Sequence, residues 1–179
     1  QKKQPHHRND ELTIFPVPFT LGEIKENISI STNTKANDSK ERIINQAIEF
    51  HVKGKIREAL KCYQYCINQG LNDHKLFSNY GGILKDLGNL KEAEVYTRKA
   101  IKFKPNYAIA HSNLGIILSD LGKLKEAEIS TRKAIKFKPN YADAHSNLGT
   151  ILKDLGKLKE AEISTRKAIK FKPNYADAH

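Results

Sequence analysis

The feature that most constrains this chain is that its sequence repeats every 34 residues. Residues 108–141 and 142–175 differ at only three of these 34 positions, and residues 74–107 form a third copy with a nearly identical second half. Residues 40–73 are a weaker fourth copy, and residues 176–179 match the start of a further one. A period of this length indicates an architecture in which each unit buries its apolar face only against its neighbours.

Each unit is expected to be a pair of antiparallel helices, which makes the chain all-α. Apolar and small residues recur at helical spacing in both halves of a unit. In the unit 108–141 these are Leu114, Gly115 and Leu118 in the first helix, and Ala127, Thr131 and Ala134 in the second. Gly122 should end the first helix, because glycine adopts positive φ without steric cost. The second helix is expected from about Leu124 to Phe137, with Pro139 preventing its continuation. Asn140 is placed to cap the first helix of the next unit.

The positions of the small residues and prolines resemble the tetratricopeptide repeat family. The family pattern has a small residue at repeat position 8, alanine at positions 20 and 27, and proline at position 32. Three units match it in phase, through Gly81, Ala93, Ala100 and Pro105, through Gly115, Ala127, Ala134 and Pro139, and through Gly149, Ala161, Ala168 and Pro173. The unit 40–73 departs from the pattern with Cys66 and Leu71. The resemblance covers residues 40–179 and implies a right-handed superhelix of helix pairs whose first helices line a concave surface.

The first 39 residues are expected to be a non-helical leader before the array of units 40–73, 74–107, 108–141 and 142–175. Leu12–Leu21 is apolar, but Pro16 and Pro18 favour an extended chain. Residues 28–39 are rich in Ser, Thr and Asn, which is typical of a linker. Two interpretations stay open, a flexible leader or an N-terminal cover in which Ile14–Phe19 packs on the array.

The two most similar units differ only on one side of their first helix. The differences fall at repeat positions 2, 9 and 12, within roughly one 100° arc of a helix that turns about 100° per residue. Position 5 lies in the same arc, whereas positions 4, 7, 8 and 11 lie opposite and are expected to form the core. The candidate ligand-contacting residues are therefore Lys75, Ile109 and Asp143 at position 2, Gly82, Ile116 and Thr150 at position 9, and Lys85, Ser119 and Lys153 at position 12. The alternative is that exposed positions drift freely, although the outer face of the second helix shows no difference between these two units.

Asparagine occupies repeat position 6 in every unit, as Asn45, Asn79, Asn113 and Asn147. A carboxamide both donates and accepts hydrogen bonds, which matches the backbone groups of a peptide. The column is therefore a candidate peptide-binding site that would hold an extended segment by its main chain. The phrase SNLG at 112–115 and 146–149 is similar to the repeats of O-GlcNAc transferase, whose array uses such a ladder. The equally supported alternative is that the asparagines bond to a neighbouring helix.

No catalytic, metal-binding or cofactor-binding motif is present in the sequence, so we expect no catalytic residue, metal or cofactor. Cys62 and Cys66 are too few for a disulfide framework and are expected to be buried. The position-4 histidines, His111, His145 and His179, replace a large aromatic residue common in the family and are expected to pack. No segment approaches the roughly 18–20 apolar residues that span a bilayer. Without a visible secretory signal, the chain is expected to be cytoplasmic and not membrane-bound.

The formal net charge of +11 suggests an acidic partner or a nucleic acid. The basic residues recur in the second helices, as in Arg132, Lys133 and Lys136, and are expected on the convex side. Acidic residues such as Glu126 alternate with them, which is typical of solvated ion pairs, and no aromatic platform for stacking bases accompanies them. An outer apolar stripe at position 22, formed by Val95, Ile129 and Ile163, is expected to contact adjacent helices or, alternatively, a second copy in a homo-oligomer.

The leading functional prediction is a protein–protein interaction scaffold that binds an extended peptide or protein segment in its concave groove. The alternative is the recognition arm of a longer enzyme, because the repeats are similar to those of bacterial proteins that continue into a transferase or oxygenase domain. Nucleic-acid binding through the basic convex face is the third and least favoured interpretation.

Overall fold

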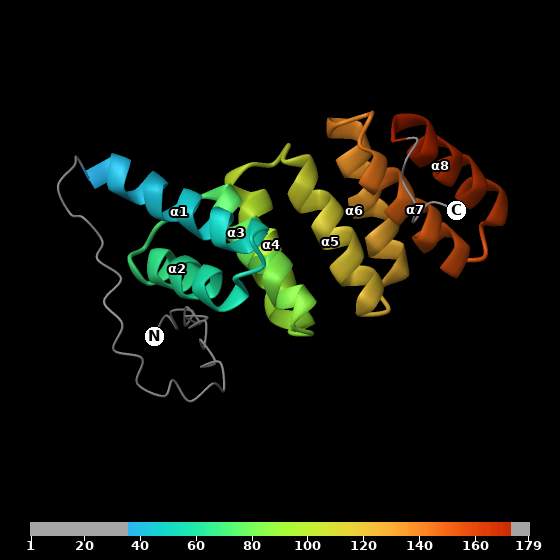
Figure 1. Cartoon of the computed structure of the whole chain (residues 1–179). Coiled ribbons are helices and arrows are strands. Elements are labelled where there is room, and N and C mark those ends of the chain that lie inside the picture. Colours follow the sequence, from blue (N-terminus) through green and yellow to red (C-terminus); the bar gives the residue numbers. More distant parts are fainter. Residues whose placement is uncertain (1–35, 173–179) are drawn as a thin grey trace, which may run out of the picture. The chain divides into compact units, whose positions relative to one another are not determined.

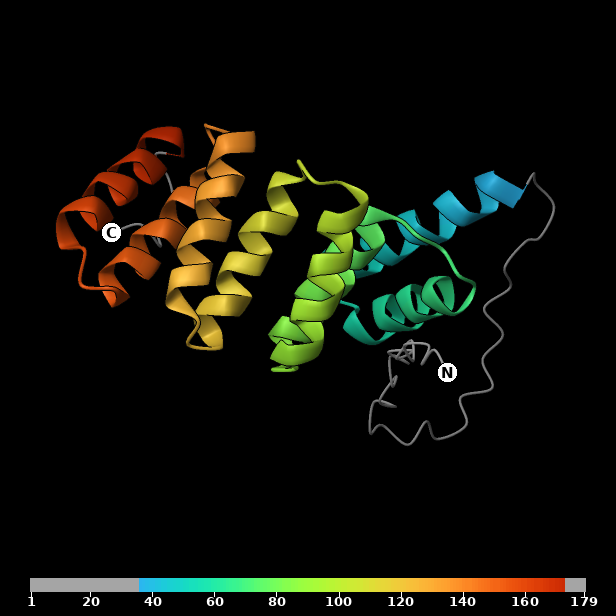
Figure 2. The ribbon, with the colours of Figure 1, turned by 180° about the vertical axis from the view of Figure 1, so that it is seen from behind.

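The computed structural model describes residues 36–172, which form eight α-helices and no strand. The helices are α1 (Ala36–Val52), α2 (Ile56–Asn68), α3 (His74–Asp86), α4 (Leu90–Phe103), α5 (Ala108–Asp120), α6 (Leu124–Phe137), α7 (Ala142–Asp154) and α8 (Leu158–Phe171). They follow one another as four antiparallel pairs, α1 with α2 through α7 with α8 (Figure 1; Figure 2 shows the same ribbon from behind). The expectations for residues 1–35 and for residues 173–179, including His179, lie outside the described residues.

The helix ends follow the glycines and prolines of the repeat. Helix α5 ends two residues before Gly122, which has a φ of +74°, and α6 spans the residues predicted from the sequence. The prediction that Asn140 caps α7 is wrong, because the N-cap residue is Tyr141 and makes no side-chain capping bond. Helix α1 begins at Ala36, so residues 36–39 are helical although the sequence favoured a linker there.

The two helices of a pair approach closely through the small residue at position 8. A Cβ atom added to Gly115 would lie 2.1 Å from Thr131 Oγ1, a distance that real Cβ atoms do not tolerate. The alanines that face this contact, Ala127 and Ala134, have no exposed surface. The expected core positions 4, 7, 8 and 11 are buried in α3, α5 and α7.

The first helices of the units lie on the inner side of the array. Helices α3, α5 and α7 contact one another in series, whereas the backbones of α4, α6 and α8 approach one another at most marginally within residues 36–172. Helices α2, α4 and α6 instead each pack between two first helices, as α4 does between α3 and α5. The structure therefore has an inner surface made by first helices and an outer surface made by second helices.

Candidate functional site

The nine variable residues at positions 2, 9 and 12 lie on the inner helices α3, α5 and α7, and none is buried. The exposed ones are Lys75, Ile109, Thr150 and Lys153, and the half-buried ones are Gly82, Lys85, Ile116, Ser119 and Asp143. Exposure is a condition for contact with a ligand, and each residue of the set meets it. The variable face of α5 is partly apolar, through Ile109 and Ile116, whereas that of α7 carries Asp143 and Lys153.

Two of the ladder asparagines are held by a serine of the preceding unit. Asn113 Nδ2 donates to Ser78 Oγ at 3.3 Å, and Asn147 Nδ2 donates to Ser112 Oγ at 3.1 Å. Both serines occupy repeat position 5 and are at most 2% exposed. The sequence placed position 5 in the arc of the open groove, and this is wrong for α3 and α5, where the serine lies buried between units.

The serine bond leaves part of each carboxamide accessible. Within the described part of the chain it is the one hydrogen bond that the side chains of Asn113 and Asn147 each make. Both side chains are half-buried, and neither carboxamide oxygen is among the buried polar atoms that lack a partner. Each asparagine is therefore fixed by a neighbouring helix, as one interpretation expected, while an acceptor oxygen and a second N–H remain available.

The first asparagines of the column lack this serine bond. In the unit that precedes Asn79, repeat position 5 holds Ile44 in place of the serine, and this buried side chain cannot accept a hydrogen bond. Burial raises the pKa of Tyr63 to about 12, and the Asn79 side chain offsets part of that rise. Asn45 lies on α1 and is exposed. The Asn–Ser pair is thus a property of the two later junctions between units.

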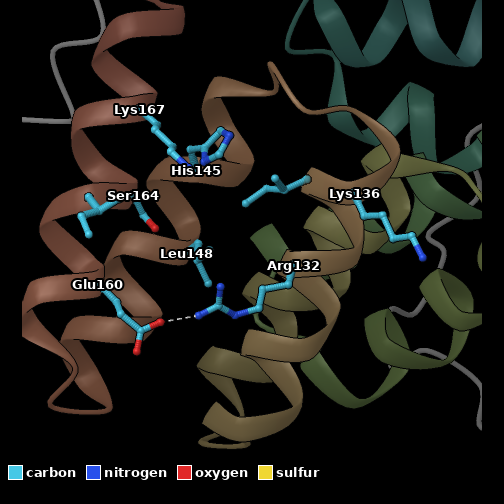
Figure 3. A pocket seen from close by; sticks show the side chains of 9 residues that line it. Arg132, Lys136, His145, Leu148, Glu160, Ser164 and Lys167 are labelled. Carbon is cyan, nitrogen blue, oxygen red and sulfur yellow. Dashed lines mark hydrogen bonds and ion pairs between the residues drawn. The ribbon is translucent and has the colours of Figure 1, made fainter.

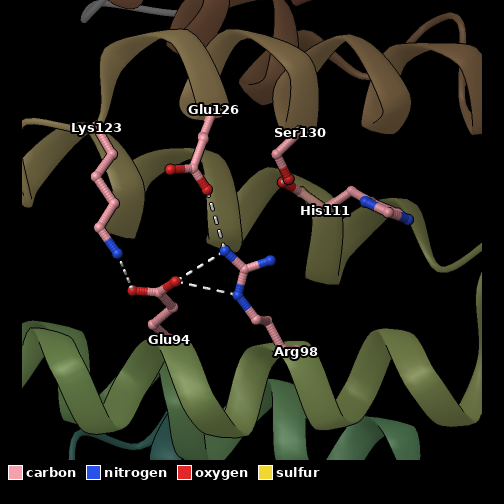
Figure 4. A network of polar contacts seen from close by, with 6 residues as sticks. All are labelled: Glu94, Arg98, His111, Lys123, Glu126 and Ser130. Carbon is pink, nitrogen blue, oxygen red and sulfur yellow. Dashed lines mark hydrogen bonds and ion pairs between the residues drawn. The ribbon is translucent and has the colours of Figure 1, made fainter.

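Ion pairs join successive second helices on the outer surface (Figure 4). Glu94 accepts hydrogen bonds from Arg98 and from Lys123 of the next unit, and Arg98 also reaches Glu126 at 3.3 Å. The arrangement recurs one unit later, with Glu128, Arg132, Lys157 and Glu160. The hydrogen bond from Lys157 lowers the pKa of Glu128; burial opposes the shift and Arg132 reinforces it. The basic residues of the outer surface are therefore partly neutralised, as the alternation of charges predicted.

The histidines and cysteines have packing roles, as predicted for those within residues 36–172. His111 and His145 are each 4% exposed, and their Nε2 atoms lie 2.8 and 2.9 Å from the carbonyl oxygens of Pro105 and Pro139. The His111 Nε2–H donates to the Pro105 carbonyl oxygen, because a carbonyl can only accept, and burial lowers the pKa of His111. Cys62 and Cys66 are buried free thiols, and burial raises the pKa of each.

Two equivalent pockets open on the outer surface, and the sequence interpretation missed them. One lies between α4, α5 and α6 with a volume of about 380 Å³, and the other lies between α6, α7 and α8 with about 390 Å³ (Figure 3). Each is lined by a serine at position 23, Ser130 or Ser164. The equivalent residue of the preceding unit is Tyr96, and this exchange was the available sequence signal. Along the same surface, the position-22 side chains of Val95, Ile129 and Ile163 are exposed by 42%, 58% and 56%.

Across residues 36–172, no helix combines the length and the apolar character that crossing a membrane requires. This finding agrees with the absence of a long apolar run from the sequence.

Comparison with known proteins identifies the family. The sequence pattern of the tetratricopeptide repeat matches residues 74–107 and 108–141, and a second pattern of the same description matches residues 131–163. The chain belongs to the tetratricopeptide repeat family. Among curated protein sequences none matches the chain.

Solved structures show the same fold. YrrB, described as a TPR protein with an unusual peptide-binding site, is 24% identical over 80% of this chain and 74% of its own, with a TM-score of 0.66. MamA from Desulfovibrio magneticus RS-1 is 22% identical over 78% of this chain and 79% of its own, with a TM-score of 0.66. Pseudomonas aeruginosa pilF is 16% identical over 79% of this chain and 65% of its own, with a TM-score of 0.71. At these identities the likeness establishes a tetratricopeptide solenoid.

Proposed function

We propose that the array is a protein-interaction scaffold that binds an extended peptide segment along the inner surface of α3, α5 and α7. The observation that carries this proposal is the pair of fixed asparagines. Asn113 and Asn147 are each oriented by a buried serine and each keep an accessible carboxamide oxygen. An oriented side chain loses less conformational entropy when a ligand binds, so its hydrogen bonds contribute more to affinity.

The repeat spacing suits an extended ligand. Helices that pack against each other lie about 8–10 Å apart, so equivalent asparagines on α5 and α7 are separated by roughly that distance. An extended chain advances about 3.3 Å per residue, which places one asparagine opposite about every third residue of the ligand. The asparagines contact the ligand backbone, and the residues at positions 2, 9 and 12 contact its side chains.

The family supports a binding role of this kind. The description of YrrB, which has the same fold, refers to a peptide-binding site. Carried over to this chain, that description gives a peptide as the class of ligand.

The asparagines are tested by selecting a binder from a displayed peptide library and measuring its affinity for single variants. Asn113→Ala and Asn147→Ala should each cost about 1 kcal/mol of binding free energy, the usual net contribution of a neutral hydrogen bond. Ser78→Ala and Ser112→Ala should weaken binding less, because they free the asparagine without removing it. Lys136→Ala is the matched control, since this ammonium group lies on outer helix α6 and points away from the other labelled residues (Figure 3).

The selectivity of the surface is tested by exchanging residues between units. Asp143→Ile and Lys153→Ser copy the residues of α5 onto α7 and should change which peptides are selected without lowering the melting temperature. If Asn113→Ala and Asn147→Ala lower the melting temperature but leave peptide affinity unchanged, the asparagines serve the fold alone and the proposal fails.

A further inference from the structure

The junction between the α1–α2 and α3–α4 pairs is the first junction of the array, and the unit 74–107 has an aromatic residue, Tyr96, at position 23. The ring of Tyr96 stacks on Phe77 with 6.1 Å between centroids and meets Tyr80 edge-on at 4.7 Å. Lys99 Nζ lies 4.7 Å from the centroid of the Tyr96 ring and 5.8 Å from that of Phe77. The side chains at positions 4, 7, 23 and 26 thus form one aromatic cluster covered by a cation.

At the two later junctions the same four repeat positions line the pockets. Smaller side chains replace the aromatic rings there, whereas the lysine at position 26 is retained. The residues are His111, Leu114, Ser130 and Lys133 in one pocket, and His145, Leu148, Ser164 and Lys167 in the other. Ser130 donates its hydroxyl to the His111 carbonyl oxygen at 3.0 Å. The space that corresponds to the Tyr96 ring of the first junction is open here. Figure 3 shows Ser164 and Lys167 beside His145, above Leu148.

We propose that each of these two pockets accepts an aromatic side chain from an acidic partner segment, in the place that Tyr96 occupies at the first junction. The Tyr96 cluster shows that the backbone of this repeat accommodates a ring there under a lysine. Within residues 36–172 neither Lys133 nor Lys167 has a cation–π contact of the kind that Lys99 makes. A ligand ring would supply one and would cover the exposed Ile129 and Ile163.

The charges around the pockets favour carboxylates beside that ring. Lys133 and Lys167 make no ion pair within residues 36–172, whereas Arg98 and Arg132 are already paired across the junctions. Acidic residues next to the aromatic side chain would complement the two lysines. A second copy of the chain is a poor occupant, because two molecules of net charge +11 repel each other.

The pocket chemistry favours a protein side chain over a nucleobase. The apolar part of the wall is aliphatic, with Ile101, Leu114, Leu118 and Ile129 in the first pocket. The polar edges of a base that faced these aliphatic side chains would lose their hydrogen bonds to water, and the Ser130 hydroxyl is already bonded.

The probe is the blocked heptapeptide Asp-Glu-Asp-Phe-Asp-Glu-Asp, titrated into the whole ¹⁵N-labelled chain at low salt. Amide shifts should concentrate at Ser130, Lys133, Ser164 and Lys167, and the same peptide with alanine for phenylalanine should bind at least tenfold more weakly. The double variant Ser130→Tyr/Ser164→Tyr, which fills both pockets as Tyr96 does, should also weaken binding at least tenfold. Lys133→Ala/Lys167→Ala should weaken it severalfold.

The inner-surface variants separate this proposal from the proposed function. Asn113→Ala/Asn147→Ala should leave the heptapeptide titration unchanged. Shifts confined to inner residues of α3, α5 and α7, or full binding by a folded Ser130→Tyr/Ser164→Tyr variant, would overturn the pocket assignment. Tighter binding of decathymidylate than of the peptide at the same residues would assign the pockets to nucleic acid instead, and concentration-dependent self-association abolished by the tyrosines would assign them to a second copy. If the tyrosine variant does not fold, the shift map of the unmodified chain decides.

Discussion

The junction between the α1–α2 and α3–α4 pairs and the two junctions after it use the same repeat but are stabilised by different interactions. The first is filled by aromatic rings, with Tyr63 and Tyr80 edge-on at 6.4 Å and Tyr80 against Tyr96. The later two have small side chains in these places and are joined by ion pairs between second helices, such as Arg132 with Glu160 at 2.7 Å. Within the described residues, the first junction has no ion pair between its second helices, and the later two have no cluster of tyrosine rings.

The residue exchanges explain this division. The glutamate and arginine of the outer network stand at positions 21 and 25, which in the first unit hold Leu60 and Gln64. Glu92 stands at position 19, the position from which Glu126 and Glu160 accept a hydrogen bond from an arginine of the preceding unit. Because Gln64 replaces that arginine, the Glu92 carboxyl lies near Tyr80 and Tyr96 without this partner, and burial raises its pKa. The comparison teaches that the 34-residue period determines the helix arrangement, while a few side chains decide whether a junction is closed or open for a ligand.

The largest effect is expected from emptying the aromatic junction. Tyr80→Ala removes a ring that is 3% exposed and contacts two other tyrosines, and it should lower the free energy of unfolding by about 3–5 kcal/mol. Leu148→Ala, at the same repeat position of the last pair, removes a smaller side chain and should cost about 2–3 kcal/mol. Urea unfolding followed by circular dichroism measures both.

Tyr80→Leu is the control for this comparison, because it copies the residue that later units carry at this position. It should cost less than Tyr80→Ala, since leucine keeps part of the packing volume. Equal costs for Tyr80→Ala and Leu148→Ala would show that the aromatic cluster adds no stability beyond that of an ordinary core position.

The sequence predicted the regular parts of the molecule well. Helix ends near Gly122 and Phe137, the buried alanines and the packing histidines all follow from local rules and the repeat period. The capping prediction for Asn140 was wrong because Tyr141 takes the N-cap position. Position 5 was misplaced because helical angle alone does not show that the next unit covers Ser78 and Ser112.

The candidate sites were predicted only in part, for the same reason. The asparagine column is visible as a spacing of 34 residues, but its serine partners become evident only when adjacent units are stacked. The outer pockets depend on three helices meeting around position 23, so the exchange of Tyr96 for Ser130 looks neutral in the sequence. Contacts between units therefore carry the information that one unit's sequence lacks.

A smaller effect is expected from the ion pairs of the later junctions. Glu128→Gln removes a carboxylate that is 14% exposed and accepts hydrogen bonds from Arg132 and Lys157, and should cost about 1 kcal/mol of stability. The loss should shrink in 0.5 M salt, because exposed charges are screened. Glu49→Gln breaks the pair with Lys53, whose side chains are 62% and 59% exposed, and should cost clearly less. An equal, salt-independent cost for both variants would contradict a role of the network in joining units.

The smallest difference is expected at the threonine that faces the close helix contact, and it should change sign between the two regions. Thr131 Oγ1 donates to the Ala127 carbonyl oxygen at 2.9 Å, whereas the equivalent Thr97 Oγ1 is buried and has no hydrogen-bond partner among the described residues. Thr131→Val should therefore destabilise the chain by about 0.5–1 kcal/mol, and Thr97→Val should stabilise it by about 0.5 kcal/mol because an unsatisfied hydroxyl is removed. Valine has nearly the same shape as threonine, so both variants keep the packing against Gly115 and Gly81. Paired thermal and urea unfolding of the two variants measures the difference, and a loss of stability in Thr97→Val as large as in Thr131→Val would show that both hydroxyls are equally well satisfied.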